Sequence, residues 1–194
     1  MSKYQLIRRM VSSESELDIQ RLKKSDMKRC DWEKLSEIMT KLAKAPLYID
    51  NNAECTIEYI INKCRSLATK EKCLGLIIID YLELIEGNTA EILSGLKKLA
   101  KEINVPILCL SQLSRELEYR EDKRPILSDL RGQIIVKNAD IIMFLYRDDY
   151  YTPSEDTAYS NAEIIIAKNG NSFATSTAKL NFKKNIGKFK DIEN

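Results

Sequence analysis

Residues 74–84, LGLIIIDYLEL, constrain the fold more than any other segment, because three consecutive isoleucines lead directly into an acid. Residues 74–79 are apolar at every position except Gly75. An unalternating run of this kind is typical of a strand that is covered on both faces within a parallel sheet. Open α/β sheets bind their ligands beyond the carboxyl ends of their strands. Asp80, the acid that ends the run, is therefore a candidate site residue.

The segment before this strand predicts two amphipathic helices. Residues 31–45 and 56–67 carry apolar side chains at helical spacing; Asp31 is well placed as the N-cap of the first helix, and Thr56 opens the second. Residues 47–50, LYID, are a short strand candidate between the two helices. Helices and strands therefore alternate, as in an α/β protein.

A second strand and helix follow the first strand. Residues 88–104 place Ile92, Leu96 and Leu99 on one helical face, and residues 105–112, VPILCLSQ, predict another buried strand. Together with the first strand they form a βαβ unit, whose crossover is expected to be right-handed. Gln112 ends the second strand as Asp80 ends the first, so it is also a candidate site residue.

The rest of the chain predicts a long loop followed by antiparallel strands. Residues 113–140 are too long and too charged for an ordinary connection of about 2–6 residues, and long loops in compact domains are often functional. Three strand candidates with loops between them follow: residues 140–147, 162–168 and 177–184. We expect one α/β domain, a mostly parallel sheet flanked by helices with antiparallel C-terminal edge strands.

Composition excludes several classes of protein. The chain has 31 basic and 29 acidic residues among 194, a net charge of +2, so any nucleic-acid contact must be local rather than a broad basic surface. The five cysteines form no CxxC pair and the chain has no histidine, which argues against a zinc site and for reduced thiols. We find no signal peptide and no apolar run near the ~18 residues of a membrane helix, so we expect a soluble, intracellular protein.

Four segments, in this order and at this spacing, indicate a protein family far more specifically than either polar strand end alone: IIIDYLEL, NVPILCLSQLSRELEYREDKRPILSDLR, ADIIMFLYRDDYY and AEIIIAK. With them, the chain resembles the C-terminal, RecA-like motor domain of bacterial replicative DNA helicases, the DnaB family, over nearly its whole length. The resemblance implies ATP-driven 5′ to 3′ unwinding of duplex DNA by a hexameric ring. It also implies ATP and Mg²⁺ as cofactors, and single-stranded DNA, primase and a helicase loader as partners.

The resemblance assigns roles by position. Asp80 matches the acid that organises Mg²⁺ through water, and Gln112 matches the glutamine that couples the γ-phosphate to the DNA loops. Residues 128–132, SDLRG, match a central-channel loop, so Arg131 and Gly132 are the expected contacts to the single-strand backbone. Lys168 matches a basic residue that reaches the ATP of the adjacent subunit, where it has both a binding and a catalytic role.

The sequence also departs from the family pattern. The phosphate cradle GxxxxGK[ST] is nowhere in the chain, and in the family both this cradle and the catalytic glutamate lie upstream of the match to Met1. The family's KQR reads Lys168, Asn169, Gly170 here, so the arginine finger is lost. The DNA loop continues as GQIIVKN, in which Lys137 keeps the capacity to contact DNA.

These departures leave three functions open. We favour a C-terminal piece of a replicative helicase, without the first strand, the phosphate loop and the N-terminal collar, and inactive alone. A non-catalytic remnant that binds single-stranded DNA or docks on a helicase ring is the alternative. A complete ATPase of another RecA-like kind ranks last. The composition, rich in Lys, Ile and Asn, suggests a plastid stroma, with a bacterial cytoplasm as the alternative.

Three other features have two interpretations each. The basic cluster Arg115, Arg120, Lys123 and Arg124 either faces DNA or a neighbouring subunit, or is a solvated face. The segment YRDDYY, residues 146–151, either stacks nucleotide or packs on its own loop. Glu83 resembles a catalytic base by position, but we interpret it as structural or as support for the site.

Overall fold

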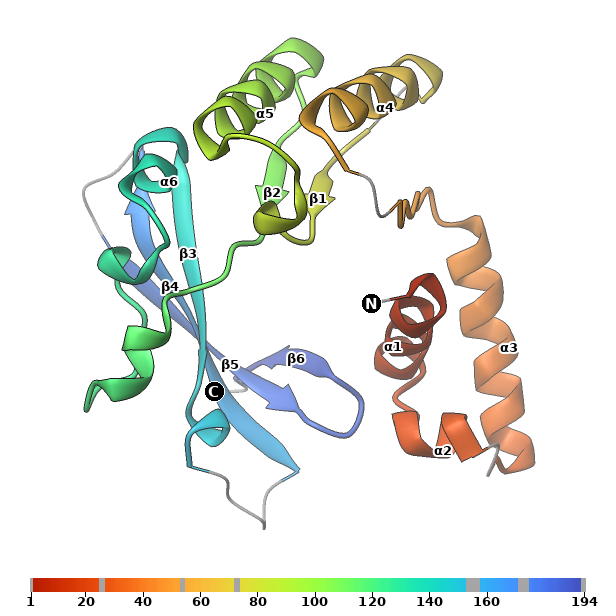
Figure 1. Cartoon of the computed structure of the whole chain (residues 1–194). Helices are drawn as coiled ribbons and strands as arrows, with labels where there is room; N and C mark the ends of the chain where they lie inside the picture. Colours follow the sequence, from red (N-terminus) through yellow and green to blue (C-terminus); the bar gives the residue numbers. More distant parts are fainter. Residues whose placement is uncertain are drawn as a thin grey trace. The chain divides into compact units, whose positions relative to one another are not determined.

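The computed structural model describes residues 2–24, 27–52, 55–71, 74–152, 158–170 and 175–192 (Figure 1). These residues fall into two compact units. The first unit comprises Met1–Asn51, Leu145–Ile164 and Thr177–Asn194. The second comprises Asn52–Phe144 and Ile165–Ser176, and it contains both predicted strand ends, Asp80 and Gln112.

The second unit contains the predicted βαβ arrangement. Strands β1 (Ile77–Ile79) and β2 (Ile107–Cys109) pair in parallel, and α5 (Thr89–Ile103) connects them. Helix α4 (Ile57–Lys70) precedes β1 and packs beside α5, as Figure 1 shows. Each strand has three residues, fewer than the sequence predicts: β1 begins three residues after the start of the apolar run and ends with it, whereas β2 is shorter than its predicted run at both ends.

The N-caps of these two helices are side chains of the expected kind. The Thr56 hydroxyl accepts a hydrogen bond from the Tyr59 amide at 3.2 Å, which confirms the predicted start of α4. The Asn88 side chain accepts from the Ala90 amide at 2.8 Å and starts α5. Asn104 ends α5 in the left-handed conformation, with φ of 54°.

The core of this unit lies on one face of the parallel strand pair. Ile79 and Ile107 pack against a cluster of buried side chains from α4, α5 and the segments around them: Ile60, Leu82, Ile85, Ile92, Leu96 and Ile135. On the other face Ile78 is 60% exposed and Leu108 is 36% exposed. The expectation that β1 is covered on both faces is therefore wrong, because α4 and α5 both pack on the side of Ile79 and Ile107.

The last strands form a four-stranded sheet in the order β3 (Ile141–Arg147), β4 (Tyr159–Asn169), β5 (Ser176–Lys183) and β6 (Lys188–Asp191). Strands β5 and β6 pair antiparallel, with Phe182 opposite Phe189 and ring centroids 4.7 Å apart. The α/β class with antiparallel C-terminal strands is thus confirmed. Strand β6, which follows a turn that Gly187 makes at φ of 66°, is not predicted from the sequence, and β4 begins three residues before its predicted start.

The first unit contains three helices, α1 (Lys3–Ser15), α2 (Ile19–Lys24) and α3 (Arg29–Lys44). The prediction that Asp31 is the N-cap of α3 is wrong, because the helix begins at Arg29. Asp31 lies in the first turn instead, where its carboxylate accepts from the Lys28 amide at 2.9 Å and pairs with Arg21 at 2.6 Å. That backbone hydrogen bond, with the Arg21 contact, lowers the pKa of Asp31.

The strand predicted at residues 47–50 is also absent from this described part of the chain. Leu47 and Tyr48 are 48% and 50% exposed, so this short segment lacks the burial that would stabilise a strand. Residues 171–174 of the predicted loop at 169–176 lie outside the described residues. None of the helices that the structure describes is long and apolar enough to cross a membrane.

The contact between α4 and α5 depends on a glycine. A Cβ added at Gly95 would lie 2.9 Å from Cγ1 of Ile57. Replacing glycine by alanine within a helix normally raises the free energy of unfolding by up to ~1 kcal/mol, whereas overpacking lowers it by roughly 1–3 kcal/mol. We therefore expect Gly95→Ala to lower the free energy of unfolding by about 1 kcal/mol, measured by urea denaturation. Ile57→Ala in the same chain should relieve the clash, and a stabilised G95A would contradict the prediction.

An ion pair in the first unit predicts acid sensitivity. Arg147 donates to both Asp149 oxygens at 3.0 Å, and Lys184 lies 3.2 Å away. Burial alone would raise the pKa of Asp149, but these hydrogen bonds outweigh burial and hold the pKa at about 2. Because this pKa is below the ~3.9 of an unfolded Asp, the stabilisation is present above that pH and is lost as pH falls through 2.

The corresponding test compares Asp149→Asn with the parent chain. The parent should exceed D149N by about 2 kcal/mol in free energy of unfolding at pH 6, and the gap should close as pH approaches 2. Denaturant unfolding at a series of pH values measures both curves. A gap that stays constant with pH would show that the carboxylate charge is not what stabilises this loop.

Candidate functional site

The structure brings Asp80 and Gln112 to the same end of the parallel strand pair. Ile79 lies opposite Cys109 in the register, and the Leu110 amide donates to the Ile79 carbonyl at 2.9 Å. The side chains of Asp80 and Gln112, which follow these last paired residues, are both exposed. A carboxylate and an amide therefore stand at the carboxyl edge of two adjacent strands, where α/β sheets bind ligands.

Glu83 fixes the chain beside Gln112. Its Oε1 accepts a hydrogen bond from the Ser111 hydroxyl at 2.7 Å and another from the backbone amide of Gln112 at 3.0 Å. These contacts agree with the interpretation of Glu83 as a supporting residue. Burial, and then the nearby Glu83 charge, raises the pKa of Cys109 to about 11, so this thiol stays protonated at neutral pH.

The residues at this edge fit part of a magnesium–nucleotide site. Within the described ranges no three His, Cys, Asp or Glu side chains lie close enough together to hold a metal. Asp80 would therefore supply one carboxylate, which suits Mg²⁺, since this ion keeps several waters and binds one or two carboxylates together with substrate phosphates. The phosphate-binding motif is absent from the sequence, so Asp80 and Gln112 make up only one side of such a site.

The predicted DNA residues lie on one short helical segment. Gly132 caps α6 (Gln133–Asn138) with φ of 118°, a conformation that favours glycine. Arg131 directly precedes this cap and Lys137 lies in the last turn, and both side chains are exposed. The segment GQIIVKN is thus a helix anchored by the buried Ile135, with a cation at each end.

Lys168 contacts the same helix within this chain. Its ammonium donates to the carbonyls of Val136 and Ala139, both at 2.7 Å, at the C-terminal end of α6. Cations at this end of a helix satisfy carbonyls that have no partner within the helix. The structure therefore brings Lys168 to the DNA segment, and its contact with a neighbouring subunit's ATP stays a prediction.

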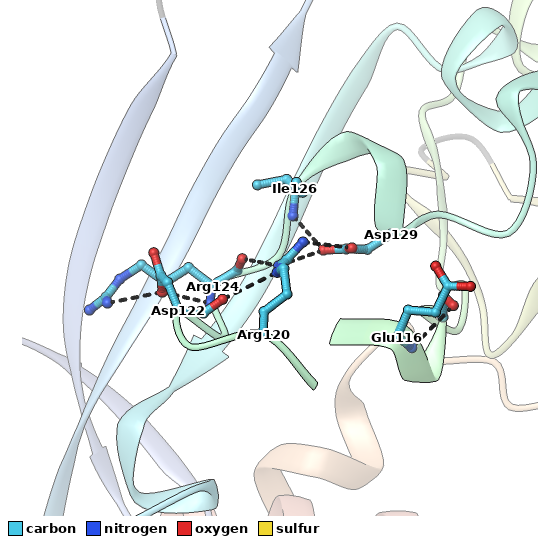
Figure 2. A network of polar contacts seen from close by, with 7 residues as sticks. Glu116, Arg120, Asp122, Arg124, Ile126 and Asp129 are labelled. Carbon is cyan, nitrogen blue, oxygen red and sulfur yellow. Dashed lines mark hydrogen bonds and ion pairs between the residues drawn. The ribbon is translucent and has the colours of Figure 1, made fainter. Parts of the chain in front are cut away.

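The predicted basic cluster is largely used to hold the loop together (Figure 2). Arg120 pairs with both oxygens of the buried Asp129 at 2.9 Å and donates to the Arg124 carbonyl at 2.7 Å. The Ile126 amide donates to the same Asp129 carboxylate at 2.8 Å. Arg115 is exposed and makes no ion pair among the residues that the structure describes. Arg120 therefore has a structural role that neither earlier interpretation included.

The tyrosines of YRDDYY pack on their own loop. The rings of Tyr146 and Tyr151 stack with centroids 6.1 Å apart, and Tyr150 meets Tyr151 edge-on at 5.1 Å. This favours the packing interpretation over stacking on a nucleotide. Nothing in the sequence singled out Lys97 of α5, which donates to the Asn138 carbonyl at 3.0 Å and to Asp140 at 2.8 Å.

Comparison with known proteins shows the class of protein. The model of the DnaB-like helicase C terminal domain family matches residues 1–191, and the chain therefore belongs to this family. It is 42% identical over 205 residues to the replicative DNA helicase DnaB of Geobacillus stearothermophilus, covering 100% of this chain and 44% of that protein. The chain thus spans less than half the length of this curated relative.

Two solved structures share the fold. A DnaB-like replicative helicase, described with its interactions with primase, superposes with a TM-score of 0.90 at 37% identity, covering 100% of this chain and 50% of that one. A second structure, described as an ATPase domain, gives a TM-score of 0.90 at 36% identity, covering 100% of this chain and 72% of that one. The predicted family and RecA-like fold are confirmed.

The buried ion pair in the loop yields a stability prediction. Arg120→Met leaves the Asp129 carboxylate, 6% exposed, without its guanidinium partner. Removing one partner of a buried pair costs about 3 kcal/mol, so we expect that loss in the free energy of unfolding. Arg115→Met, the control with an exposed side chain, should change it by about 0.5 kcal/mol or less. Equal effects of the two variants in urea denaturation would contradict the structural role of Arg120.

Proposed function

We propose that this chain is part of a replicative DNA helicase motor, which unwinds duplex DNA in the 5′ to 3′ direction as an ATP-driven hexameric ring. The observation that carries the proposal is the position of Asp80 and Gln112 at the carboxyl ends of two adjacent parallel strands. The superposition on a solved ATPase domain supports it.

In this proposal Asp80 and Gln112 act on the phosphate end of ATP. Asp80 orients the water ligands of Mg²⁺, and the ion, when bound, supplies positive charge that neutralises the phosphates. Gln112 senses the terminal phosphate through its exposed amide. Glu83 accepts a hydrogen bond from the Gln112 backbone amide at 3.0 Å, so the Gln112 side chain extends from a fixed position.

A direct backbone connection joins Gln112 to the DNA segment. Leu113 forms an antiparallel bridge with Leu130, and the Ser114 amide donates to the Asp129 carbonyl at 2.7 Å. Gln112 thus lies one residue before this bridge, and Arg131 lies one residue after it. A change at the ATP site has a short covalent and hydrogen-bonded route to the DNA contact.

Arg131, Gly132 and Lys137 bind the single strand in this proposal. Their contacts are made to phosphates, so they are independent of base sequence and weaken as salt rises. The phosphate-binding motif is not found in these 194 residues, so in this proposal other polypeptide supplies the phosphate cradle and the catalytic glutamate. Lys168 reaches ATP across the subunit boundary, and primase and a loader are the expected partners in a plastid or a bacterial cytoplasm.

A chimera provides the test. This chain replaces the matching segment of the Geobacillus stearothermophilus helicase, and both ATP hydrolysis and 5′ to 3′ unwinding are measured. We expect the chimera to be active, and Asp80→Asn to lower ATP turnover by about 100-fold or more, because the acid that orients the metal's waters is lost. Gln112→Ala should hydrolyse ATP with little response to added single-stranded DNA.

The chimera also distinguishes the alternatives. A folded, hexameric chimera that binds DNA but hydrolyses no ATP would overturn the proposal and favour a non-catalytic DNA-binding role. Glu83→Gln serves as a control for charge near the site, since Glu83 Oε1 accepts hydrogen bonds from Ser111 and Gln112. Its effect should be smaller than that of D80N.

A further inference from the structure

Helix α6 is too short to be stable through its own hydrogen bonds. It has six residues, Gln133–Asn138, whereas isolated helices shorter than about 12–15 residues are marginal in water. Its N-cap is Gly132, which offers no side-chain hydrogen bond. Apart from the buried Ile135 and from Ile134, which packs against the same core, the position of α6 therefore depends on what holds its C-terminal end.

Two lysines from different elements hold that end. Lys168 of β4 donates to the Val136 and Ala139 carbonyls at 2.7 Å. Lys97 of α5 donates to the Asn138 carbonyl at 3.0 Å and to the Asp140 carboxylate, just past the helix, at 2.8 Å. These carbonyls are the groups that a helix leaves without internal partners, and positive charge there opposes the negative end of the helix dipole.

We propose that Lys97 is a positioning residue for single-strand binding. Together with Lys168 it fixes the C-terminal end of α6, and so it holds Arg131 and Lys137 at the two ends of the helix in one arrangement. The inference rests on the proposed function, because it takes these two side chains as the DNA contacts. No contact of Lys97 with DNA itself is required.

The surroundings of Lys97 suit a positioning role. Its own helix is held in the core by Ile92, Leu96 and Leu99, which are 2%, 5% and 1% exposed, so the lysine projects from a fixed base. Its ammonium already makes two hydrogen bonds, and its side chain is 34% exposed. The hydrogen bond from Lys97 lowers the pKa of Asp140, so the ion pair persists through neutral pH.

Binding of a fluorescein-labelled oligo(dT) strand to the full chain, followed by anisotropy, tests the inference. Lys97→Met should raise the dissociation constant by about 3–10-fold. Lys97→Arg should bring it back to within about 2-fold of the parent value, because arginine can donate to the same oxygens. Lys98→Met is the matched control, with the same charge change on the same helix but an exposed side chain and no described contact with α6. It should change the dissociation constant by less than about 2-fold.

The decisive comparison uses R131A/K137A as the background. If Lys97 acts through Arg131 and Lys137, adding K97M to the R131A/K137A variant should not weaken its DNA binding further. An additive loss would mean that Lys97 contacts phosphate directly, and equal effects of K97M and K98M would mean a general charge effect; either result overturns the inference. If K97M does not fold, Asp140→Asn, which removes the carboxylate partner and keeps both lysines, should show the same loss.

The same data separate this inference from the proposed function. If R131A/K137A binds the strand as tightly as the parent does, the segment is not the DNA site, and the DNA part of the proposed function fails together with the inference. If R131A/K137A loses affinity while K97M behaves as K98M does, the DNA site stands and only the role of Lys97 is refuted.

Discussion

The parallel pairing of β1 with β2 is the constraint on which the candidate site depends. Because Ile79 lies opposite Cys109, the residues after each strand emerge at the same edge, where Asp80 and Gln112 both lie although they are far apart in the chain. The helix between the strands supplies the core that keeps this register. The ATP-side chemistry proposed for the chain is thus a consequence of one short ladder.

Local pattern predicted much of the fold, and tertiary context decided the rest. The apolar face of α5 and the Thr56 cap follow from helical spacing and hydrogen-bonding capacity, which the sequence displays directly. Burial of both faces of β1 does not follow, because hydrophobicity predicts that a strand can be covered but not which elements cover it. The prediction of an N-cap at Asp31 is wrong for a similar reason. Asp31 contacts Lys28 and Arg21 from the first turn of a helix that begins at Arg29, and the helical spacing does not show these contacts.

The candidate site was predictable in its residues but not in its connections. Asp80 and Gln112 could be identified because polar strand ends carry function in α/β sheets. The contacts of Glu83, Lys97 and Arg120 could not, since each joins positions that no spacing rule relates. In the charged loop Arg120, Lys123 and Arg124 contact the protein itself, whereas Arg131 and Lys137 are exposed and available for a ligand.

The uncovered face of the parallel strand pair affects how the chain behaves in solution. Leu76, Ile78 and Leu110, 49%, 60% and 43% exposed, form an aliphatic surface with the neighbouring Leu108. Surfaces of this kind are sites of protein association or aggregation. Association of the separate chain through this surface therefore increases with protein concentration and depends on the salt and cosolvents that modulate hydrophobic contact.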